Sequence, residues 1–141
     1  MKTTKTECPI DFAARVVGDR WSLLILRDIL LYSKSRFSEL ASEEGIATNI
    51  LSDRLRQLVD RGVIEKKRDP DDRRSYIYQA TSRGNGLAGL MSELGAWGTT
   101  HEPASKDLIG TLKHYRPDSE VAATIRSNIY RNRYADDTDM Q

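Results

Sequence analysis

The sequence lacks long apolar runs and has only one cysteine. Its 141 residues include one cysteine, Cys8, so an intrachain disulfide is excluded. No apolar run exceeds four residues, whereas a membrane-spanning helix needs about twenty. Residues 1–7 are polar and contain no hydrophobic signal segment, so we expect a cytoplasmic protein with no membrane contact.

A strong charge of either sign is also missing. The chain has 22 basic and 21 acidic residues, for a formal net charge of +1. Residues 134–141 carry three aspartates and no basic residue, so residues 1–133 carry +4. Many nucleic-acid-binding domains are far more basic, so the total charge does not identify a binding partner. The positions of the charged residues are more informative than their sum.

Motifs that carry catalysis or hold a cofactor are absent. The sequence contains no phosphate-binding loop, no nucleophile–base pair and no paired carboxylates at catalytic spacing. Gly84-Asn85-Gly86 lacks the strand and helix that flank a dinucleotide-binding fingerprint. The soft metal ligands Cys8, His101 and His114 are far apart in the sequence. We therefore expect neither an enzyme nor a cofactor or metal site.

Two helices are expected near the start. Residues 8–17 are rich in apolar side chains, and Pro9 suits a first helical turn because its missing N–H has no helical partner there. Asp19 can cap a second helix over residues 20–32. That helix is apolar on nearly all sides, which predicts a central, buried position.

The next segment has the pattern of a helix-turn-helix. A short helix is expected over residues 37–41, a turn follows to Gly45, and a longer helix covers residues 48–62. One face of the longer helix is apolar, with Ile50, Leu51, Leu55, Leu58 and Val59. Two helices joined by a glycine-containing turn predict this motif.

A β-hairpin is expected directly afterwards. Residues 63–68 and 75–81 alternate in polarity, and a polar segment containing Pro70 separates them. A helix-turn-helix followed by a charged hairpin is a winged helix. The predicted fold is therefore mainly α with a small β-hairpin wing (α+β).

Another helix is expected after Thr81, which can cap it. Its apolar residues form one narrow stripe at helical spacing: Leu87, Leu90, Met91, Leu94 and Trp97. Five glycines lie in the same region, so this helix needs packing to persist. Residues 105–141 are expected to form a helical extension with a disordered acidic end.

Several segments, in order, resemble the HxlR family of bacterial winged-helix transcription regulators. They are CP at 8–9, DRWSLLILR at 19–27, RFSEL at 36–40, LSDRLRQL at 51–58, GVI at 62–64 and YQATSRG at 78–84. The sequence departs from the family at Ala47, where a capping serine is usual and Thr48 is expected to substitute. Ala80 replaces a usual leucine.

The resemblance implies a homodimer that binds double-stranded DNA, with the helices that flank the winged core forming the interface. Residues 1–104 would then be the winged-helix DNA-binding and dimerisation domain, and residues 105–141 the extension. We expect a sequence-specific transcriptional regulator on an inverted-repeat operator. The alternative is a winged-helix protein-interaction module without sequence-specific DNA binding. The sequence identifies no small-molecule effector.

The candidate DNA contacts fall into two groups. Short polar side chains and arginine can reach base edges in the major groove, and the recognition helix offers Thr48, Asn49, Ser52, Asp53 and Arg56. Asp53 would either read a cytosine amino group or orient Arg56. The candidate wing and backbone contacts are Lys34, Arg36, Arg68, Arg73 and Arg74. Residues 65–74 carry five basic and four acidic residues, so a self-paired surface loop is the opposing interpretation of the wing.

Cys8 and the apolar stripe complete the candidate sites. At the cap of the first helix, the unpaired N–H groups and the helix dipole favour a thiolate at Cys8. In part of the HxlR family a cysteine at this place acts as a thiol switch, which implies redox or electrophile sensing. The alternative is a small buried hydrophobe. The stripe from Leu87 to Trp97 is expected at a dimer interface, with the lining of a ligand pocket as its alternative.

Overall fold

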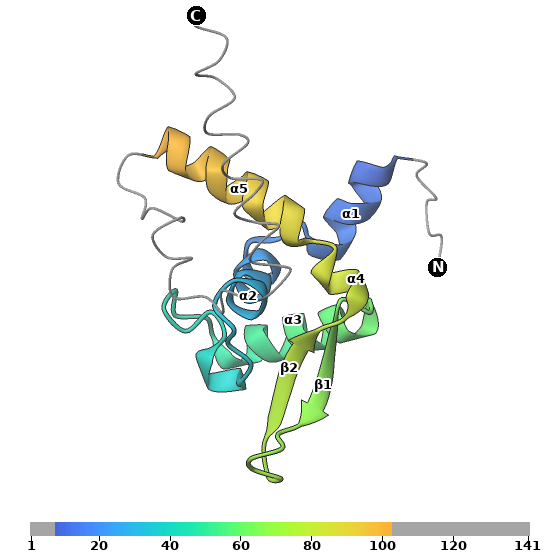
Figure 1. The fold of residues 1–141 in the computed structure, drawn as a ribbon, viewed down its shortest axis with the longest axis vertical. Coiled ribbons are helices and arrows are strands. Elements are labelled where there is room, and N and C mark those ends of the chain that lie inside the picture. Colours follow the sequence, from blue (N-terminus) through green and yellow to red (C-terminus); the bar gives the residue numbers. More distant parts are fainter. Residues whose placement is uncertain (1–7, 103–141) are drawn as a thin grey trace, which may run out of the picture.

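The computed structural model describes residues 8–102 and has the predicted winged-helix architecture (Figure 1). Its elements, in order, are α1 (Pro9–Val17), α2 (Arg20–Leu30), the 3-10 turn η1 (Phe37–Glu39), α3 (Thr48–Asp60), β1 (Ile64–Arg68), β2 (Tyr76–Ala80), α4 (Ser82–Asn85) and α5 (Ala88–His101). The predicted fold class, mainly α with a small β-hairpin, is confirmed. The predictions for residues 105–141 and for His114 lie outside the described residues.

The hairpin and the flanking helices occupy opposite ends of the molecule. Figure 1 shows the hairpin projecting from the lower end, with α1 and α5 diverging at the upper end. The central helix α2 contacts α3, β2 and α5. No helix among residues 8–102 is long and apolar enough to cross a membrane.

Three of the predicted helix starts are confirmed and one is wrong. Pro9 occupies the first turn of α1 with Cys8 as N-cap, and the Asp19 carboxylate accepts from Ser22 N at 3.2 Å. The Thr81 hydroxyl accepts from Gly84 N at 3.2 Å. Helix α3, however, is capped by Ala47 without any side-chain bond, because Thr48 already lies inside the helix.

The core forms where the apolar faces of α2 and α3 meet the first strand. Ile25 and Leu26 of α2 are fully buried, and the α3 face predicted from the sequence contributes Leu51, Leu55 and Leu58. Burying each of these side chains contributes about 1.5–3 kcal/mol, so they dominate the stability of the domain. The α2 helix ends at Leu30 rather than at residue 32, and the expected helix at 37–41 is only the single turn η1.

The hairpin is antiparallel and pairs the residues that the alternation predicted. Ile64 lies opposite Ala80, and Arg68 lies opposite Tyr76. On the same face the Lys66 ammonium lies 4.3 Å from the centre of the Tyr76 ring and 5.9 Å from that of Tyr78. These cation–π contacts support a sheet that has only two strands within residues 8–102.

The single helix expected after Thr81 is two helices. Helix α4 ends at Asn85 and α5 begins at Ala88, with Gly86 and Leu87 between them. Gly84 lies so close to the residue that precedes β1 that a Cβ there would be 2.0 Å from the Val63 carbonyl oxygen. The α4 turn can therefore pack against the strand only with glycine at this position.

A buried carboxylate that the sequence did not indicate holds the turn of the helix-turn-helix. Asp28 has no solvent exposure, and its Oδ2 accepts from Ala41 N at 2.7 Å. Ala41 has φ of +51°, a conformation that costs an alanine about 1–2 kcal/mol. The hydrogen bond to Asp28 offsets this strain and fixes the direction in which the chain enters α3.

Arg27 connects this carboxylate to the far side of the same turn. Its guanidinium donates to Asp28 Oδ1 at 3.0 and 2.9 Å and to both oxygens of Glu44, with an Nη2–Oε2 distance of 3.1 Å. The hydrogen bond from Arg27 lowers the pKa of Glu44 below its ordinary value, although partial burial opposes the shift. Glu44 is therefore held in the charged form that the arginine binds.

We predict that Asp28→Ala lowers the free energy of unfolding by about 3–5 kcal/mol. The substitution leaves the buried Ala41 N–H without an acceptor and removes one partner of a buried ion pair. Urea unfolding measures the loss.

Asp11→Ala is the matched control, because Asp11 pairs with Arg15 on the surface of α1. Its removal should change stability by less than about 1 kcal/mol. A similarly small loss for Asp28→Ala would show that the turn holds without the carboxylate.

Candidate nucleic-acid interface

Helix α3 presents a polar face to solvent. Its buried leucines turn the opposite side outward, where Thr48, Asn49, Ser52 and Arg56 are exposed and Asp53 is half-buried. The predicted base-reading residues therefore share one face, near the start of the helix. This is the arrangement that lets a recognition helix enter a major groove.

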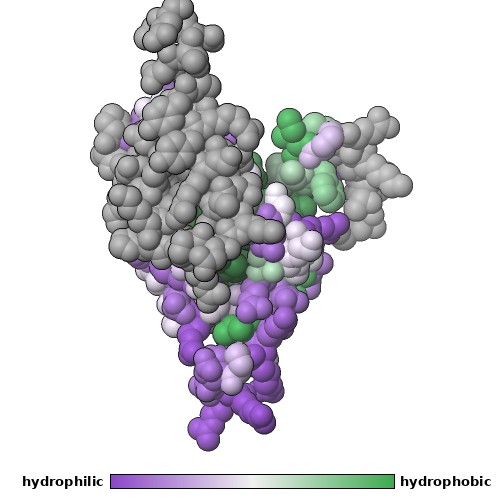
Figure 2. Space-filling view, viewed as in Figure 1, coloured by the Kyte–Doolittle hydropathy of each residue, from purple (hydrophilic) through white to green (hydrophobic). Residues whose placement is uncertain are grey.

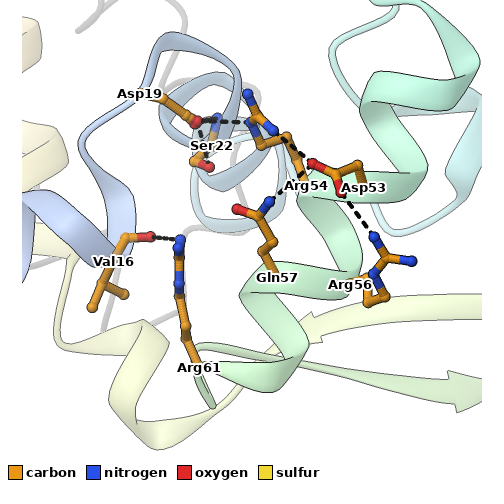
Figure 3. A network of polar contacts seen from close by, with 8 residues as sticks. All are labelled: Val16, Asp19, Ser22, Asp53, Arg54, Arg56, Gln57 and Arg61. Atoms are coloured by element: carbon orange, nitrogen blue, oxygen red, sulfur yellow. Dashed lines mark hydrogen bonds and ion pairs between the residues drawn. The ribbon is translucent and has the colours of Figure 1, made fainter. Parts of the chain in front are cut away.

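Asp53 does not project alone from this face. Its Oδ1 accepts from Arg56 Nη2 at 2.9 Å, and its Oδ2 accepts from Arg54 Nη1 at 2.7 Å and Gln57 Nε2 at 2.9 Å (Figure 3). Both oxygens are occupied by neighbours on α3. Of the two roles expected from the sequence, the geometry favours the one in which Asp53 orients Arg56.

The tip of the wing exposes two cations. Arg73 and Arg74 are exposed, and within residues 8–102 their guanidinium groups form no ion pair. Asp72 builds the turn by accepting from Arg74 N at 3.1 Å and from Ser75 Oγ at 3.0 Å. These two hydrogen bonds lower the pKa of Asp72, and the bond from the Arg74 backbone has the larger effect. The Asp72 carboxylate thus stabilises the turn and forms no ion pair with Arg73 or Arg74 in the described structure.

The other predicted backbone contacts already have partners within the protein. Arg36 Nη2 lies 2.7 Å from the buried Asp69 carboxylate, and Arg68 Nη1 donates to the Arg73 carbonyl at 2.7 Å. The Lys34 ammonium lies 5.6 Å from the centre of the Tyr32 ring. The arginines at the base of the wing are therefore paired within the protein, whereas the two arginines at its tip form no ion pair in the described structure. Neither of the two interpretations of the wing holds for all of it.

The wing is fixed to the helix-turn-helix by its base. Ile77 forms a β-bridge with Arg36, and Tyr78 N donates to the Ser35 carbonyl at 2.8 Å. Together with the ion pair between Arg36 and Asp69, these bonds set the wing beside α3. A polar helix face flanked by a cationic hairpin tip is the geometry of a DNA-binding winged helix.

Comparison with protein families agrees with this geometry. The model of the HxlR-like helix-turn-helix family matches residues 16–106. The chain belongs to this family. Its members named below are helix-turn-helix transcriptional regulators, so the family predicted from the sequence is confirmed.

The curated relatives carry the same description. The uncharacterized HTH-type transcriptional regulator Rv3095 of Mycobacterium tuberculosis is 34% identical over 73% of this chain, and the match spans 65% of that relative. The chain thus spans just under two thirds of the length of Rv3095. The HTH-type transcriptional regulator YodB of Bacillus subtilis is 30% identical over 65% of this chain and 83% of its own length.

Solved structures share the fold. The crystal structure of PA1607, a candidate transcription factor, superposes with a TM-score of 0.66 at 33% identity, covering 72% of each chain. Diamide-treated YodB from B. subtilis superposes with a TM-score of 0.52 at 28% identity, covering 67% of this chain and 94% of YodB.

The end of this HxlR-like domain opposite the wing is apolar. Figure 2 shows hydrophilic residues over the hairpin and hydrophobic ones gathered on α1. On α1 Ile10 and Phe12 are exposed, and on α5 Leu90, Leu94 and Trp97 are exposed, with Trp97 68% exposed. Separate large apolar side chains are common on surfaces, but five of them on α1 and α5 make these two helices the candidate interaction surface.

The predicted α5 stripe is therefore divided. Leu90, Leu94 and Trp97 point outward, whereas Met91 is buried in the core and Leu87 is half-buried against it. Ile10 and Phe12 were not among the predicted site residues. Both belong to the single apolar side of α1, and the breadth of that side was the available signal, because the core buries only Val17 of this helix.

Cys8 lies at the N-cap of α1, beside this apolar end. It is exposed rather than buried, and it forms no disulfide. The alternative of a small buried hydrophobe is therefore wrong. No cluster of three or more potential metal ligands occurs among residues 8–102.

Proposed function

We propose that this HxlR-like protein is a non-enzymatic, sequence-specific DNA-binding transcriptional regulator that acts as a homodimer on an inverted repeat. The observation that carries the proposal is the exposed polar face of α3, set in a helix-turn-helix and flanked by the wing. Asn49 has the chemistry to read adenine, and Arg56 has the chemistry to read guanine. Arg73 and Arg74 would contact phosphates or the minor groove beside the bases that α3 reads.

Selection of genomic DNA fragments by the reduced protein at near-physiological salt tests this proposal. An enriched inverted repeat with half-sites about one helical turn apart would support a symmetric dimer that reads two major grooves. The alternative is an interaction module, and the paired charges at the base of the wing favour it. DNA affinity with no salt dependence and no enriched sequence would select that alternative.

Arg56→Ala should weaken operator binding and relax the preference at one base pair by about 1–3 kcal/mol, because it removes a bidentate base contact. Binding measured against all single-base operator variants checks this. Arg74→Ala is the comparison, since a lost phosphate contact should weaken binding evenly and reduce the salt slope by about 1. An unchanged base preference in Arg56→Ala would remove Arg56 from the base-reading set.

We assign the dimer interface to the apolar end formed by α1 and α5. Leu94→Glu should convert the dimer to monomers and lower operator affinity at least about tenfold, because it places a charge in an apolar contact and breaks two-site binding. Sedimentation measures the assembly state. Glu93→Gln, at the neighbouring exposed position of α5, should remain dimeric. A dimeric Leu94→Glu variant would place the interface elsewhere.

Cys8 is the proposed thiol sensor. Its support is its exposure at the start of α1 and the likeness of the fold to diamide-treated YodB. With one cysteine in each chain, an oxidant such as diamide would take two hydrogens from two Cys8 thiols and link two subunits. The sensor would therefore need a second protein molecule or a small thiol as its partner.

Cys8→Ser should bind DNA as the reduced wild type does and should keep that affinity in diamide. The wild type should lose affinity and recover it with dithiothreitol. Gel mobility without reductant reports the linked dimer. A wild-type affinity that diamide leaves unchanged contradicts the sensor and leaves the DNA-binding proposal intact.

A further inference from the structure

One arginine that faces away from the predicted base contacts joins two parts of the fold. The Arg54 guanidinium donates from Nε to Asp19 Oδ2 at 3.1 Å and from Nη1 to Asp53 Oδ2 at 2.7 Å (Figure 3). Asp19 precedes α2, whereas Asp53 belongs to α3. A single planar group therefore bridges the start of the central helix and the recognition helix.

Both carboxylates are themselves fixed. Asp19 caps α2 by accepting from Ser22 N and from Ser22 Oγ, the latter at 2.8 Å. Asp53 accepts from Arg56 on its other oxygen. The chain of contacts thus runs from the cap of α2 through Arg54 and Asp53 to Arg56.

Arg56 depends on the last of these contacts. Its side chain is 72% exposed, and Asp53 is the only partner that holds its guanidinium among the described residues. A long exposed arginine otherwise samples many rotamers, and fixing it before binding lowers the ordering penalty of a base contact. Without Arg54, Asp53 Oδ2 would keep only the neutral Gln57 amide at 2.9 Å. Asp53 would then lose its one ion pair other than that with Arg56, and with it the connection to Asp19.

We propose that Arg54 is a positioning residue that determines base specificity. It acts by holding Asp53, so that Asp53 presents Arg56 to the DNA in one orientation. The proposal rests on the proposed function, since it concerns the residue through which the recognition helix reads a base. In this proposal Arg54 acts through Asp53 and not by contacting a base.

The fold provides a matched control in Arg61, which lies seven residues further along the chain at the C-cap of α3. Arg61 Nη1 donates to the Val16 carbonyl at 2.8 Å and so ties α3 to α1 (Figure 3). Arg54 and Arg61 line the same polar cleft, which lies between α1, the turn before α2, and α3. Arg61 does not contact Asp53 in the described structure, so it shares the bridging role without the link to Arg56.

The test measures affinities for the selected operator and its single-base variants at fixed salt. The proteins are the wild type, R56A, R54K, D19N, R61M and the double variant R54K/R56A. R54K keeps the charge, but an ammonium cannot span both carboxylates as a planar guanidinium does. D19N weakens the contact that anchors Arg54, and asparagine still caps a helix well. It therefore tests the same link by a second substitution if R54K fails to fold.

We expect R54K and D19N to lose about fivefold or more of the discrimination at the base pair where R56A loses it. R54K/R56A should discriminate no worse than R56A alone, because both changes act on one contact. R61M should keep the wild-type base preference. Thermal unfolding of each variant separates these effects from lost stability.

Three results would overturn the proposal while leaving DNA binding in place. They are an unchanged base preference in both R54K and D19N, an even loss of affinity across all operator variants, or an equal loss of preference in R61M. A wild type with no sequence preference would overturn the proposed function as well, so the two failures are distinguishable.

Discussion

The carboxylate of Asp28, which has no solvent exposure, holds the turn from which the recognition helix departs. Its bond to Ala41 N stabilises a left-handed backbone that alanine would otherwise avoid. Arg27 balances its charge and binds Glu44 across the same turn. The buried side chains of α2 and α3 dominate the packing energy, but this polar cluster sets the direction in which α3 points.

The molecule is divided into a polar end and an apolar end. The wing and the outward face of α3 carry the exposed cations and amides, while α1 and α5 carry exposed aromatic and aliphatic side chains. The apolar end costs free energy in water unless a second surface covers it. The proposed function fits such a division, since it uses the polar end for DNA and the apolar end for a second subunit.

Periodicity and caps were enough to predict the order of the elements. Asp19 and Thr81 cap where expected, and the apolar face of α3 is buried as its spacing indicated. The partners of polar side chains could not be predicted from periodicity, because the sequence around an aspartate in an apolar helix does not indicate which distant backbone N–H it will accept from. Asp28 and Arg54 were missed for that reason. The division of the α5 stripe was missed because periodicity does not say which edge of a stripe the core covers. In α5 the buried side is that of Ala88, Met91 and Ser92, which leaves Leu90, Leu94 and Trp97 outside.

The attachment of the wing to the segment before η1 has a consequence for any DNA that the domain contacts. Ile77 and Tyr78 are bonded to Arg36 and Ser35, so the hairpin cannot swing independently of the helix-turn-helix. These bonds therefore restrict the separation between α3 and the wing before any DNA is bound. A duplex whose groove widths differ from that separation must itself deform, and sequences that deform easily are favoured even at bases that no side chain touches.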